Sequence, residues 1–376
     1  MFEINQLVNL AKRENNEKRS YLYVNPLQGK HIPVNPRKTK EMCKLLADEV
    51  KKSCSNEKLF VIGFAETATA IASYVASYLD NAMYFENTTR EEEMKESEYL
   101  YFTESHSHAT EQKLNAKWFD DYLFMVDRIV FVEDEVTTGN TIYKLITEIK
   151  TRFPKKTIKF SIASVLNSMI DDRIQELSKQ DIDCIYLKKI PFEYRKDVID
   201  TYEEKDECML NCIDASYNKL PKIHQVTGGI DPRVTCKVDD YLMRVNHFCA
   251  YVYENEFRNK VVDEVLIIGT EEFMYPAIEL AGYLQEQGVC KEIKTHSTTR
   301  SPIMAYDVED YPLHNRYTLI SVYDDERVTY IYNLKKYDEV VVVTDSKLVS
   351  HKGLESLLSA LQKVGNNNIS VYQWSV

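Results

Sequence analysis

The residues best suited to chemistry lie in one short stretch of the chain. An apolar run over residues 128–132 ends in two acids, Glu133 and Asp134, and a helical pattern begins soon after them. Carboxylates at a strand end can accept hydrogen bonds from the vicinal hydroxyls of a ribose. Between the acids and the helix stand three hydroxyls, a glycine and backbone N–H groups that together can hold a phosphate: Thr137, Thr138, Gly139, Asn140 and Thr141.

An ordinary strand-to-helix connection is the simpler explanation of these residues. A capped helix needs one hydroxyl at its N-terminus, whereas this stretch supplies three. It also supplies a glycine, which lets the backbone close round an anion, and the two acids. We therefore predict a sugar-phosphate site at this position.

The stretch resembles the phosphoribosyl pyrophosphate signature of type I phosphoribosyltransferases, in which an apolar strand, two acids and two further residues precede Thr-Thr-Gly-x-Thr. Glu133 is the one departure, because aspartate is commoner there. Residues 21–34, 105–111 and 299–302 are similar to orotate-phosphoribosyltransferase-like proteins that carry a C-terminal TRSP domain and occur in tellurium-resistance-type stress gene clusters. This resemblance covers nearly all of the chain.

The resemblance implies a role for each matching position. Glu133 and Asp134 become the acids that bind the ribose hydroxyls, and residues 137–141 become the loop for the 5′-phosphate. The pyrophosphate is expected after two earlier strands, on Gly63, Glu66, Thr67, Thr89 and Arg90. Arg90 is nearly as well explained as an exposed, solvated charge.

The resemblance also places a flexible lid over residues 104–117. Closure of a lid would exclude water from an oxocarbenium-like transition state that otherwise hydrolyses. His106 or Lys113 could supply a cation to the departing pyrophosphate, although polar loop residues are by default solvated. Magnesium is expected to arrive bound to substrate oxygens, without a dedicated protein metal site.

The first half alternates short β-branched runs with amphipathic helical stretches, which predicts an α/β fold with a largely parallel sheet. Its architecture is expected to be type I phosphoribosyltransferase-like, with helices on both faces of the sheet. Residues 91–112 are very polar and predict a mobile loop. Strands are predicted at 59–63, 82–85, 128–132, 157–165 and 182–187, and helices at 39–52, before 79, 139–151 and 171–178.

The periodicity weakens near residues 205–215, which predicts two domains, 1–210 and 211–376. The second domain, also α/β, weakly repeats the first: a strand, a Gly and a helix over residues 265–285, a Thr-Thr-Arg at 298–300, and a strand ending in Asp345. It is either a degenerate duplicate or an unrelated α/β domain with similar local patterns. It lacks the acid pair and the phosphate loop. A second anion site could still form on Thr298, Thr299, Arg300 and Ser301.

The composition of the chain limits the kinds of partner that it is expected to bind. The chain has 376 residues and a formal net charge of −12, which argues against extended nucleic-acid binding. The sequence contains no run of about 18 apolar residues, so no membrane-spanning helix is predicted. The absence of a leader pattern predicts a cytoplasmic protein. The eight cysteines are expected to be reduced and mostly buried. Lys30, His31 and Arg37 form a basic cluster that could meet an anion, or could flank an ordinary hairpin turn.

The leading hypothesis is an enzyme that transfers the phosphoribosyl group from phosphoribosyl pyrophosphate to an unidentified small-molecule acceptor, in a nucleotide-like metabolite pathway. The reverse pyrophosphorolysis fits the same residues. A non-catalytic sensor of phosphoribosyl pyrophosphate is the alternative, but a sensor has no need of a lid that excludes water. A homodimer is left open.

Overall fold

A computed structural model describes residues 2–14, 20–91, 98–102, 112–154, 157–191, 202, 207–214, 220–347 and 349–376. The chain forms two compact units. We call Lys40–Tyr194 with Ile230–Met243 the motif unit, and Met1–Thr39, Arg195–Gly229 and Arg244–Val376 the companion unit. This grouping differs from the predicted division at residue 210, because the first 39 residues group with the second half and a short later segment groups with the first.

The motif unit is built on a six-stranded sheet with the order β12-β4-β3-β7-β8-β9. Five of these strands are mutually parallel, and β12 pairs with β4 in the antiparallel sense. Their apolar runs are buried, as expected for a parallel sheet covered on both faces. The strands are β3 (Leu59–Gly63), β4 (Ala82–Asn87), β7 (Arg128–Val136), β8 (Lys159–Asn167), β9 (Ile182–Lys189) and β12 (Cys236–Lys237).

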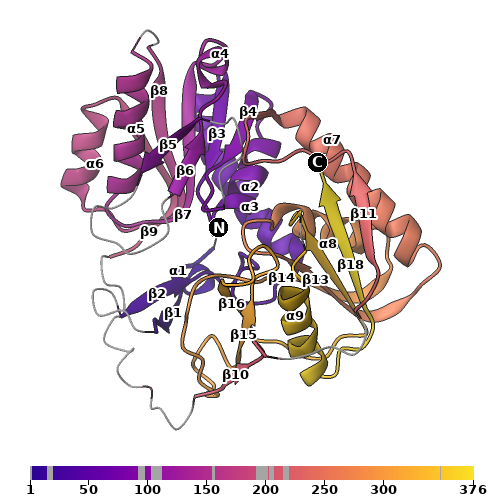
Figure 1. Cartoon of the computed structure of the whole chain (residues 1–376). Helices are drawn as coiled ribbons and strands as arrows, with labels where there is room; N and C mark the ends of the chain where they lie inside the picture. The colour runs from indigo at the N-terminus through magenta and orange to yellow at the C-terminus, as the bar shows by residue number, and fades with distance from the viewer. Residues whose placement is uncertain are drawn as a thin grey trace. The chain divides into compact units, whose positions relative to one another are not determined.

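Helices cover the two faces of this sheet. Phe60 and Ile62 belong to one hydrophobic cluster with Leu145 of α5 and Leu177 of α6. Val61 lies between them in the strand and points to the opposite face, on the side where α3 contacts β3, β4 and β7. Figure 1 shows α5 and α6 on the other side of the sheet from α2 and α3. The helices are α2 (Pro36–Cys54), α3 (Thr69–Ser77), α4 (Phe119–Leu123), α5 (Asn140–Arg152) and α6 (Asp171–Ser178).

These elements confirm the predicted strands and helices of the first half, with ends that shift by a few residues. The expected loop over residues 91–112 is wrong in one part, because β5 (Tyr99–Phe102) lies inside it. β5 pairs in the antiparallel sense with β6 (Gln112–Asn115). Phe102 and Leu114 are buried in the same core as the main sheet, and these apolar side chains anchor the hairpin despite its polar surroundings. Residues 92–97 and 103–111 lie outside the described part of the chain.

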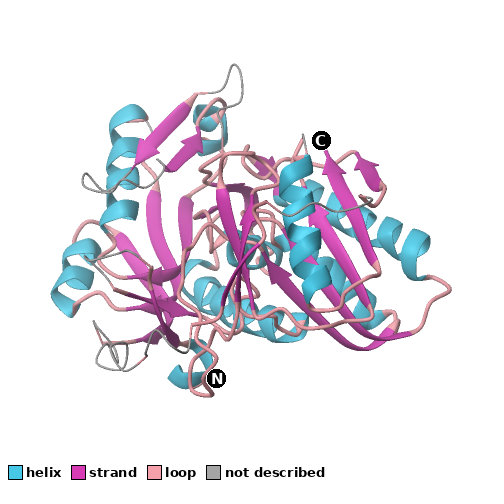
Figure 2. Cartoon of the chain, turned by 60° about the horizontal axis from the view of Figure 1, so that its bottom comes forward, coloured by secondary structure: helices cyan, strands magenta, loops and turns pink. Residues whose placement is uncertain are grey.

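The companion unit is built on a second parallel sheet with the order β11-β18-β17-β13-β14. Figure 2 shows its strands side by side with helices along them. Its strands are β11 (Ile223–Thr227), β13 (Val262–Gly269), β14 (Cys290–Ser297), β17 (Glu339–Thr344) and β18 (Ile369–Ser375). A separate sheet contains β10 (Met209–Asn211), β15 (Arg316–Ile320) and β16 (Val328–Tyr332). The helices of this unit are α8 (Tyr275–Glu286) and α9 (His351–Lys363). α7 (Val238–Val252) begins in the motif unit, passes into the companion unit after Met243, and runs into a π-helical turn, Tyr253–Phe257.

The arrangement of the first sheet recurs in the second. The order β14-β13-β17-β18 reproduces β4-β3-β7-β8. α8 follows β13 and α9 follows β17, as α3 follows β3 and α5 follows β7. Backbone contacts recur as well. Thr88 N donates to Gly63 O (2.8 Å) and Thr298 N to Gly269 O (3.1 Å), and bridges pair Thr89 with Lys113 and Thr299 with Tyr330.

The N-terminal residues belong to the companion unit because their apolar side chains are buried there. β1 (Asn9–Lys12) and β2 (Tyr21–Val24) form a hairpin after a short helix, α1 (Ile4–Leu7). Val24 lies in a cluster with Ile303 and Tyr332. The idea of a basic anion-binding cluster is corrected for Lys30 and His31, which are both buried. Lys30 Nζ donates to the carbonyl of Glu271 at 2.5 Å.

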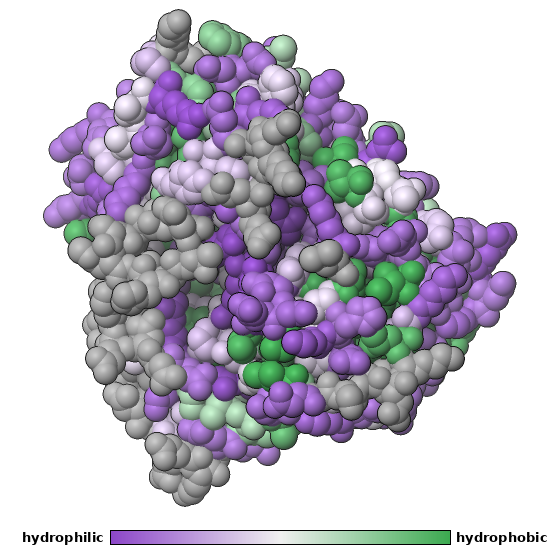
Figure 3. All heavy atoms as spheres, in the orientation of Figure 1, coloured by the Kyte–Doolittle hydropathy of each residue, from purple (hydrophilic) through white to green (hydrophobic). Residues whose placement is uncertain are grey.

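The surface of the described residues is largely hydrophilic in the view of Figure 3, with smaller hydrophobic areas between the polar side chains. No helix among the described residues is long and apolar enough to cross a membrane.

Candidate functional site

β7 carries the acid pair toward its carboxyl end. It continues past Glu133 and Asp134 to Val136, and both acids are only partly buried. The Oε2 atom of Glu133 is buried and has no hydrogen-bond partner among the described residues. Burial, and then the neighbouring charge of Asp134, raise the pKa of Glu133 well above its usual range. A buried carboxyl oxygen without a protein partner is a group that a ligand hydroxyl can satisfy.

The predicted phosphate loop joins β7 to α5. Gly139 has φ 70° and caps the helix, whose first hydrogen bond runs from Tyr143 N to Gly139 O (2.9 Å). A Cβ at Gly139 would lie 2.9 Å from Met169 Sδ, so both the backbone angle and the space favour glycine. Thr138 and Asn140 are exposed, and Asn140 N donates to Thr138 Oγ1 at 3.3 Å. The loop is therefore open to a ligand.

Arg173 of α6 supports this loop and was missed by the sequence reasoning. Its Nε donates to Thr138 O (3.4 Å), and its Nη2 donates to Asn140 Oδ1 (3.3 Å). Its guanidinium also stacks on Tyr143, 4.9 Å from the ring centre, and pairs with Glu176 at 2.7 Å. Nothing local marks Arg173, since it lies 32 residues beyond Thr141 and only the fold brings it to the loop.

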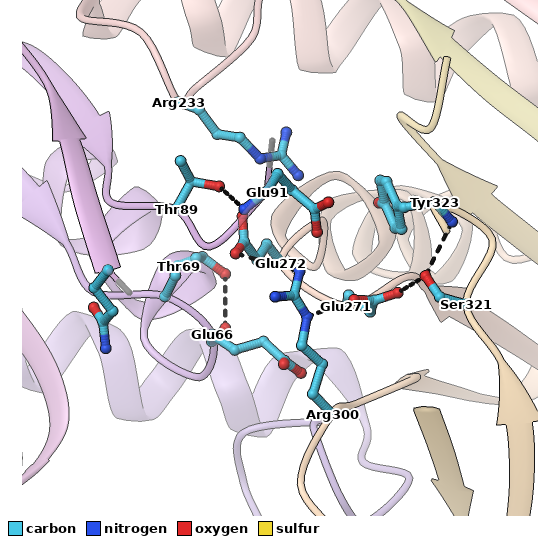
Figure 4. Close-up of polar contacts among 12 residues, drawn as sticks. Glu66, Thr69, Thr89, Glu91, Arg233, Glu271, Glu272, Arg300, Ser321 and Tyr323 are labelled. Atoms are coloured by element: carbon cyan, nitrogen blue, oxygen red, sulfur yellow. Dashed lines mark hydrogen bonds and ion pairs between the residues drawn. The ribbon is translucent and has the colours of Figure 1, made fainter. Parts of the chain in front are cut away.

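The turn after β3 forms a second part of the site. Ala65 N donates to Thr88 Oγ1 at 2.9 Å, which ties this turn to the end of β4. The Ala65–Glu66 peptide bond is cis. Figure 4 shows Glu66 beside Thr69, whose hydroxyl donates to the Glu66 carbonyl at 3.4 Å. Glu66 is buried and Thr67 partly exposed.

Gly63 has a packing role in this turn. A Cβ there would lie 2.3 Å from Asn87 Oδ1 and 2.5 Å from Ala72 Cβ. Because that space is filled, Gly63 lets β3 approach both β4 and α3.

The Thr89–Arg90 segment extends the site toward the β5-β6 hairpin. Thr89 and Lys113 exchange backbone hydrogen bonds of 2.9 and 3.1 Å. Arg90 lies close enough to Glu133 for its charge to lower the pKa of that acid, against the larger effect of burial. The structure thus brings the predicted residues after β3, β4 and β7 to one end of the sheet, as parallel strands require.

The two predicted lid residues have different outcomes. His106 lies outside the described residues. Lys113 is buried in β6, with its ammonium 5.3 Å from the centre of the Tyr99 ring. The ring holds this cation inside the hairpin rather than in a solvated loop.

In the companion unit, an internal carboxylate occupies the neighbourhood of the predicted second anion site. Arg300 Nε lies 2.6 Å from Glu271 Oε2, and Arg327 Nη1 lies 3.0 Å from the same atom. Glu271 also accepts a hydrogen bond from the Ser321 hydroxyl. Figure 4 shows Arg300 and Ser321 pointing toward this carboxylate.

The hydroxyls of that predicted site are used internally too. Thr298 Oγ1 accepts from Glu271 N at 3.0 Å, and Thr299 Oγ1 accepts from Ser301 N at 3.2 Å. Asp345, the single acid retained after β17, accepts from the Tyr323 hydroxyl at 2.6 Å. These contacts join the predicted residues to Glu271 in one network within the companion unit, and an anion site on them stays a prediction.

Two family models match the chain. Residues 7–188 match the family described as "Phosphoribosyl transferase". Residues 235–361 match "TRSP domain C terminus to PRTase_2". The two matches lie in the order of a phosphoribosyl transferase followed by a C-terminal TRSP domain. This confirms the resemblance drawn from the acid pair and the Thr-Thr-Gly loop. No curated protein sequence matches the chain.

Solved structures of phosphoribosyltransferases are distantly similar to this chain. Adenine phosphoribosyl transferase from Trypanosoma brucei is 10% identical, with a TM-score of 0.36, covering 53% of this chain and 83% of that chain. Orotate phosphoribosyltransferase from Aeropyrum pernix is 15% identical, with a TM-score of 0.30, covering 49% and 88%.

Proposed function

We propose that the motif unit binds magnesium-bound phosphoribosyl pyrophosphate and transfers its phosphoribosyl group to a small-molecule acceptor. The observation that carries the proposal is the buried Oε2 atom of Glu133, which has no hydrogen-bond partner among the described residues and lies just before an open Thr-Thr-Gly loop. A ribose that carries a 5-phosphate supplies a hydroxyl for the acid and an anion for the loop.

Each part of the site has a separate task in this reaction. Glu133 and Asp134 accept hydrogen bonds from the two ribose hydroxyls, and residues 137–141 donate backbone N–H and side-chain hydroxyl groups to the 5′-phosphate. Arg173 holds the loop in shape through Thr138 and Asn140. The sugar is thereby fixed with its anomeric carbon exposed to attack, and positioning of this kind lowers the barrier.

The bond changes are a displacement at the anomeric carbon. The acceptor's lone pair forms the new bond to this carbon, while the bond from carbon to the pyrophosphate oxygen breaks and its electron pair leaves with pyrophosphate. The acceptor then gives up a proton to restore neutrality. The turn after β3, with Thr89 and Arg90, is proposed to bind the departing group, where a cation offsets the developing negative charge.

Magnesium enters this scheme as part of the substrate. Phosphate oxygens and water satisfy much of its coordination, so it needs few protein ligands. Among the described residues there is no group of three or more His, Cys, Asp or Glu side chains that could hold a metal ion. The ion neutralises part of the pyrophosphate charge when it is bound.

Isothermal titration with phosphoribosyl pyrophosphate and magnesium tests the binding step. The wild-type chain is expected to bind the donor, and the double variant Asp134→Asn, Thr138→Ala is expected to bind it at least about a hundredfold more weakly, because two charge-assisted contacts are lost. Asp172→Asn with Thr147→Ala is the matched control, because both residues are exposed and lie outside the loop. Wild type without binding heat, or equal binding by both double variants, would reject the proposal.

Pyrophosphate release distinguishes an enzyme from a sensor. Steady release in the presence of a panel of bases and small acids supports transfer, whereas tight donor binding without release under any acceptor supports the sensor. The similarity to proteins of tellurium-resistance-type gene clusters suggests a nucleotide-like metabolite in a stress response. Metabolite profiles of cells with and without the gene test that link.

A further inference from the structure

A buried serine of β8 has no hydrogen-bond partner for its side chain among the described residues. Ser164 is 0% exposed, and its Oγ atom makes no hydrogen bond within that part of the chain. The backbone around it is used by the sheet, because Ser164 pairs with Glu133 of β7 on one side and with Tyr186 of β9 on the other. A hydroxyl removed from water without a partner costs free energy, so an alanine would suit the packing of this strand better.

A second buried serine of the same strand shows the ordinary arrangement. Ser161 is also 0% exposed, and its hydroxyl accepts a hydrogen bond from Arg128 Nη1 at 2.7 Å. Buried polar groups are normally satisfied in this way, and an exception in a native fold needs an explanation. A group that is satisfied only when a ligand is bound is one such explanation.

The sheet places Ser164 beside the acid that carries the proposed function. In the register of β7 and β8, which lie side by side (Figure 1), Ser164 is the partner of Glu133, as Ile162 is the partner of Phe131. Phe131 and Ile162 belong to one hydrophobic cluster, and the alternation of side chains directs Glu133 and Ser164 to the same face. Neighbouring strands are about 4.8 Å apart, so rotation of either side chain can bring the hydroxyl to the carboxyl group.

We propose that Ser164 is a positioning residue for donor binding, whose hydroxyl donates a hydrogen bond to the Glu133 carboxyl group when that group receives a ribose hydroxyl. The inference rests on the proposed function and adds to it a residue of β8, outside the Thr-Thr-Gly stretch. A carboxylate has several lone pairs and can accept from the ribose and the serine together. Donation from the serine also lowers the cost of a negative charge on a buried acid.

A purely structural role predicts the opposite change in stability. If a buried water joined Ser164 to Glu133 in the free protein, the hydroxyl would belong to the folded network and its removal would destabilise the chain. If the hydroxyl is used only in the complex, its removal takes an unsatisfied group out of the free protein and does not destabilise it. Stability and donor affinity measured on the same variants therefore separate the two roles.

Urea unfolding and isothermal titration of the full chain with phosphoribosyl pyrophosphate and magnesium provide the test. Ser164→Ala is expected to unfold at the same or a higher urea concentration than wild type, and to bind the donor about tenfold more weakly. Ser164→Thr keeps the hydroxyl but adds a methyl group to a packed core. It is expected to bind the donor as wild type does and to unfold at a lower urea concentration. Ser161→Ala is the matched control, because it removes a partnered hydroxyl and should lower stability without changing donor affinity.

The outcomes separate this inference from the proposed function. Wild-type donor affinity in Ser164→Ala, or a loss in Ser164→Thr equal to that of the alanine variant, overturns this inference alone. Unfolding of Ser164→Ala at a lower urea concentration, as expected for Ser161→Ala, assigns Ser164 a structural role and overturns it as well. A wild-type chain that does not bind the donor overturns the inference together with the proposed function.

Discussion

The carboxyl group of Glu133 lies where ionisation is unfavourable. Its pKa lies well above the usual range because of burial and the Asp134 charge, so the folded chain keeps a proton that the unfolded chain has already lost. Stability from this group is therefore fully present below the ordinary glutamate pKa and is lost as the pH rises through the raised value. The same property suits a group that meets a sugar hydroxyl away from bulk water.

Glu133→Gln should remove this pH dependence. The stability of the variant relative to wild type is expected to rise with pH above about 4.5, by up to about 1.4 kcal/mol per pH unit, until the raised pKa is passed. Urea unfolding of both proteins over a pH series measures the difference. Burial also raises the pKa of Glu86, which is present in both proteins and cancels in the comparison. Parallel curves for the two proteins would contradict the prediction.

Whether a residue of the candidate site could be predicted depends on how close it lies in the sequence to the other site residues. Glu133, Asp134 and the loop to Thr141 could be predicted, because the chemistry is written in consecutive residues. Arg173 could not, because it reaches the loop only after α6 has packed against the sheet. A lone arginine in a sequence carries no local pattern.

At the scale of elements, the β7-to-α5 connection depends on the backbone of Gly139. A left-handed residue with a Cβ costs about 1–2 kcal/mol, so Gly139→Ala is expected to lower stability by about that amount and to weaken donor binding. Gly139→Asn is the informative comparison, since asparagine tolerates this angle. Thermal unfolding should order the proteins as wild type, Asn and Ala.

Met169 provides a control on that argument. Its Sδ is the nearest atom to the Cβ that a substitution would add. Met169 is itself buried, so the cost of Gly139→Ala is measured against Met169→Ala as the parent protein. If the loss came from contact alone, Gly139→Ala would cost little in that background, and if it comes from the backbone angle, the cost is the same in both backgrounds.

Sequence periodicity predicted most elements of the first half because each carries its own apolar pattern. α6 was placed at its observed ends, and β3 likewise. β5 was missed because only four residues, Tyr99–Phe102, interrupt a long polar stretch. β12 was missed because two residues are too few to show an alternation, and its existence depends on pairing with β4.

At the scale of the whole molecule, the same order of strands occurs in both units, but the side chains that follow the strands differ. In the motif unit the turn after β3 adjoins the acid pair and an open loop. In the companion unit, the turn after β13 contains Glu271, which is almost fully buried between Arg300 and Arg327. In the second copy this acid is therefore paired with arginines of its own unit.

Glu271→Gln tests this internal neutralisation. The substitution removes the buried carboxylate that Arg300 and Arg327 share and is expected to destabilise the chain by about 3 kcal/mol. Asp263→Asn is the control, because it breaks an exposed pair with Lys291 and should cost far less. Chemical unfolding of both variants measures the contrast. Similar losses would show that the Glu271 network is not a stabilising core.

The grouping of the chain into units could not be predicted from the sequence. Domain boundaries are usually inferred as single cuts, whereas here the path passes from one unit to the other at residues 39–40, 194–195, 229–230 and 243–244. The N-terminal hairpin belongs to the companion unit because its apolar side chains pack with residues between 303 and 332. No local sequence pattern predicts these contacts.

The segment of residues 230–237, which ends in β12, has a practical consequence for anyone dissecting this protein. A fragment that stopped where the phosphoribosyltransferase match stops would lack β12 and leave β4 as an open border of the sheet, a known route to aggregation. It would also lose Pro232 and Thr235 as supports for the residues before the Thr-Thr-Arg segment. Exchange of the C-terminal half would therefore require a new partner for β4 at the border of the motif unit's sheet.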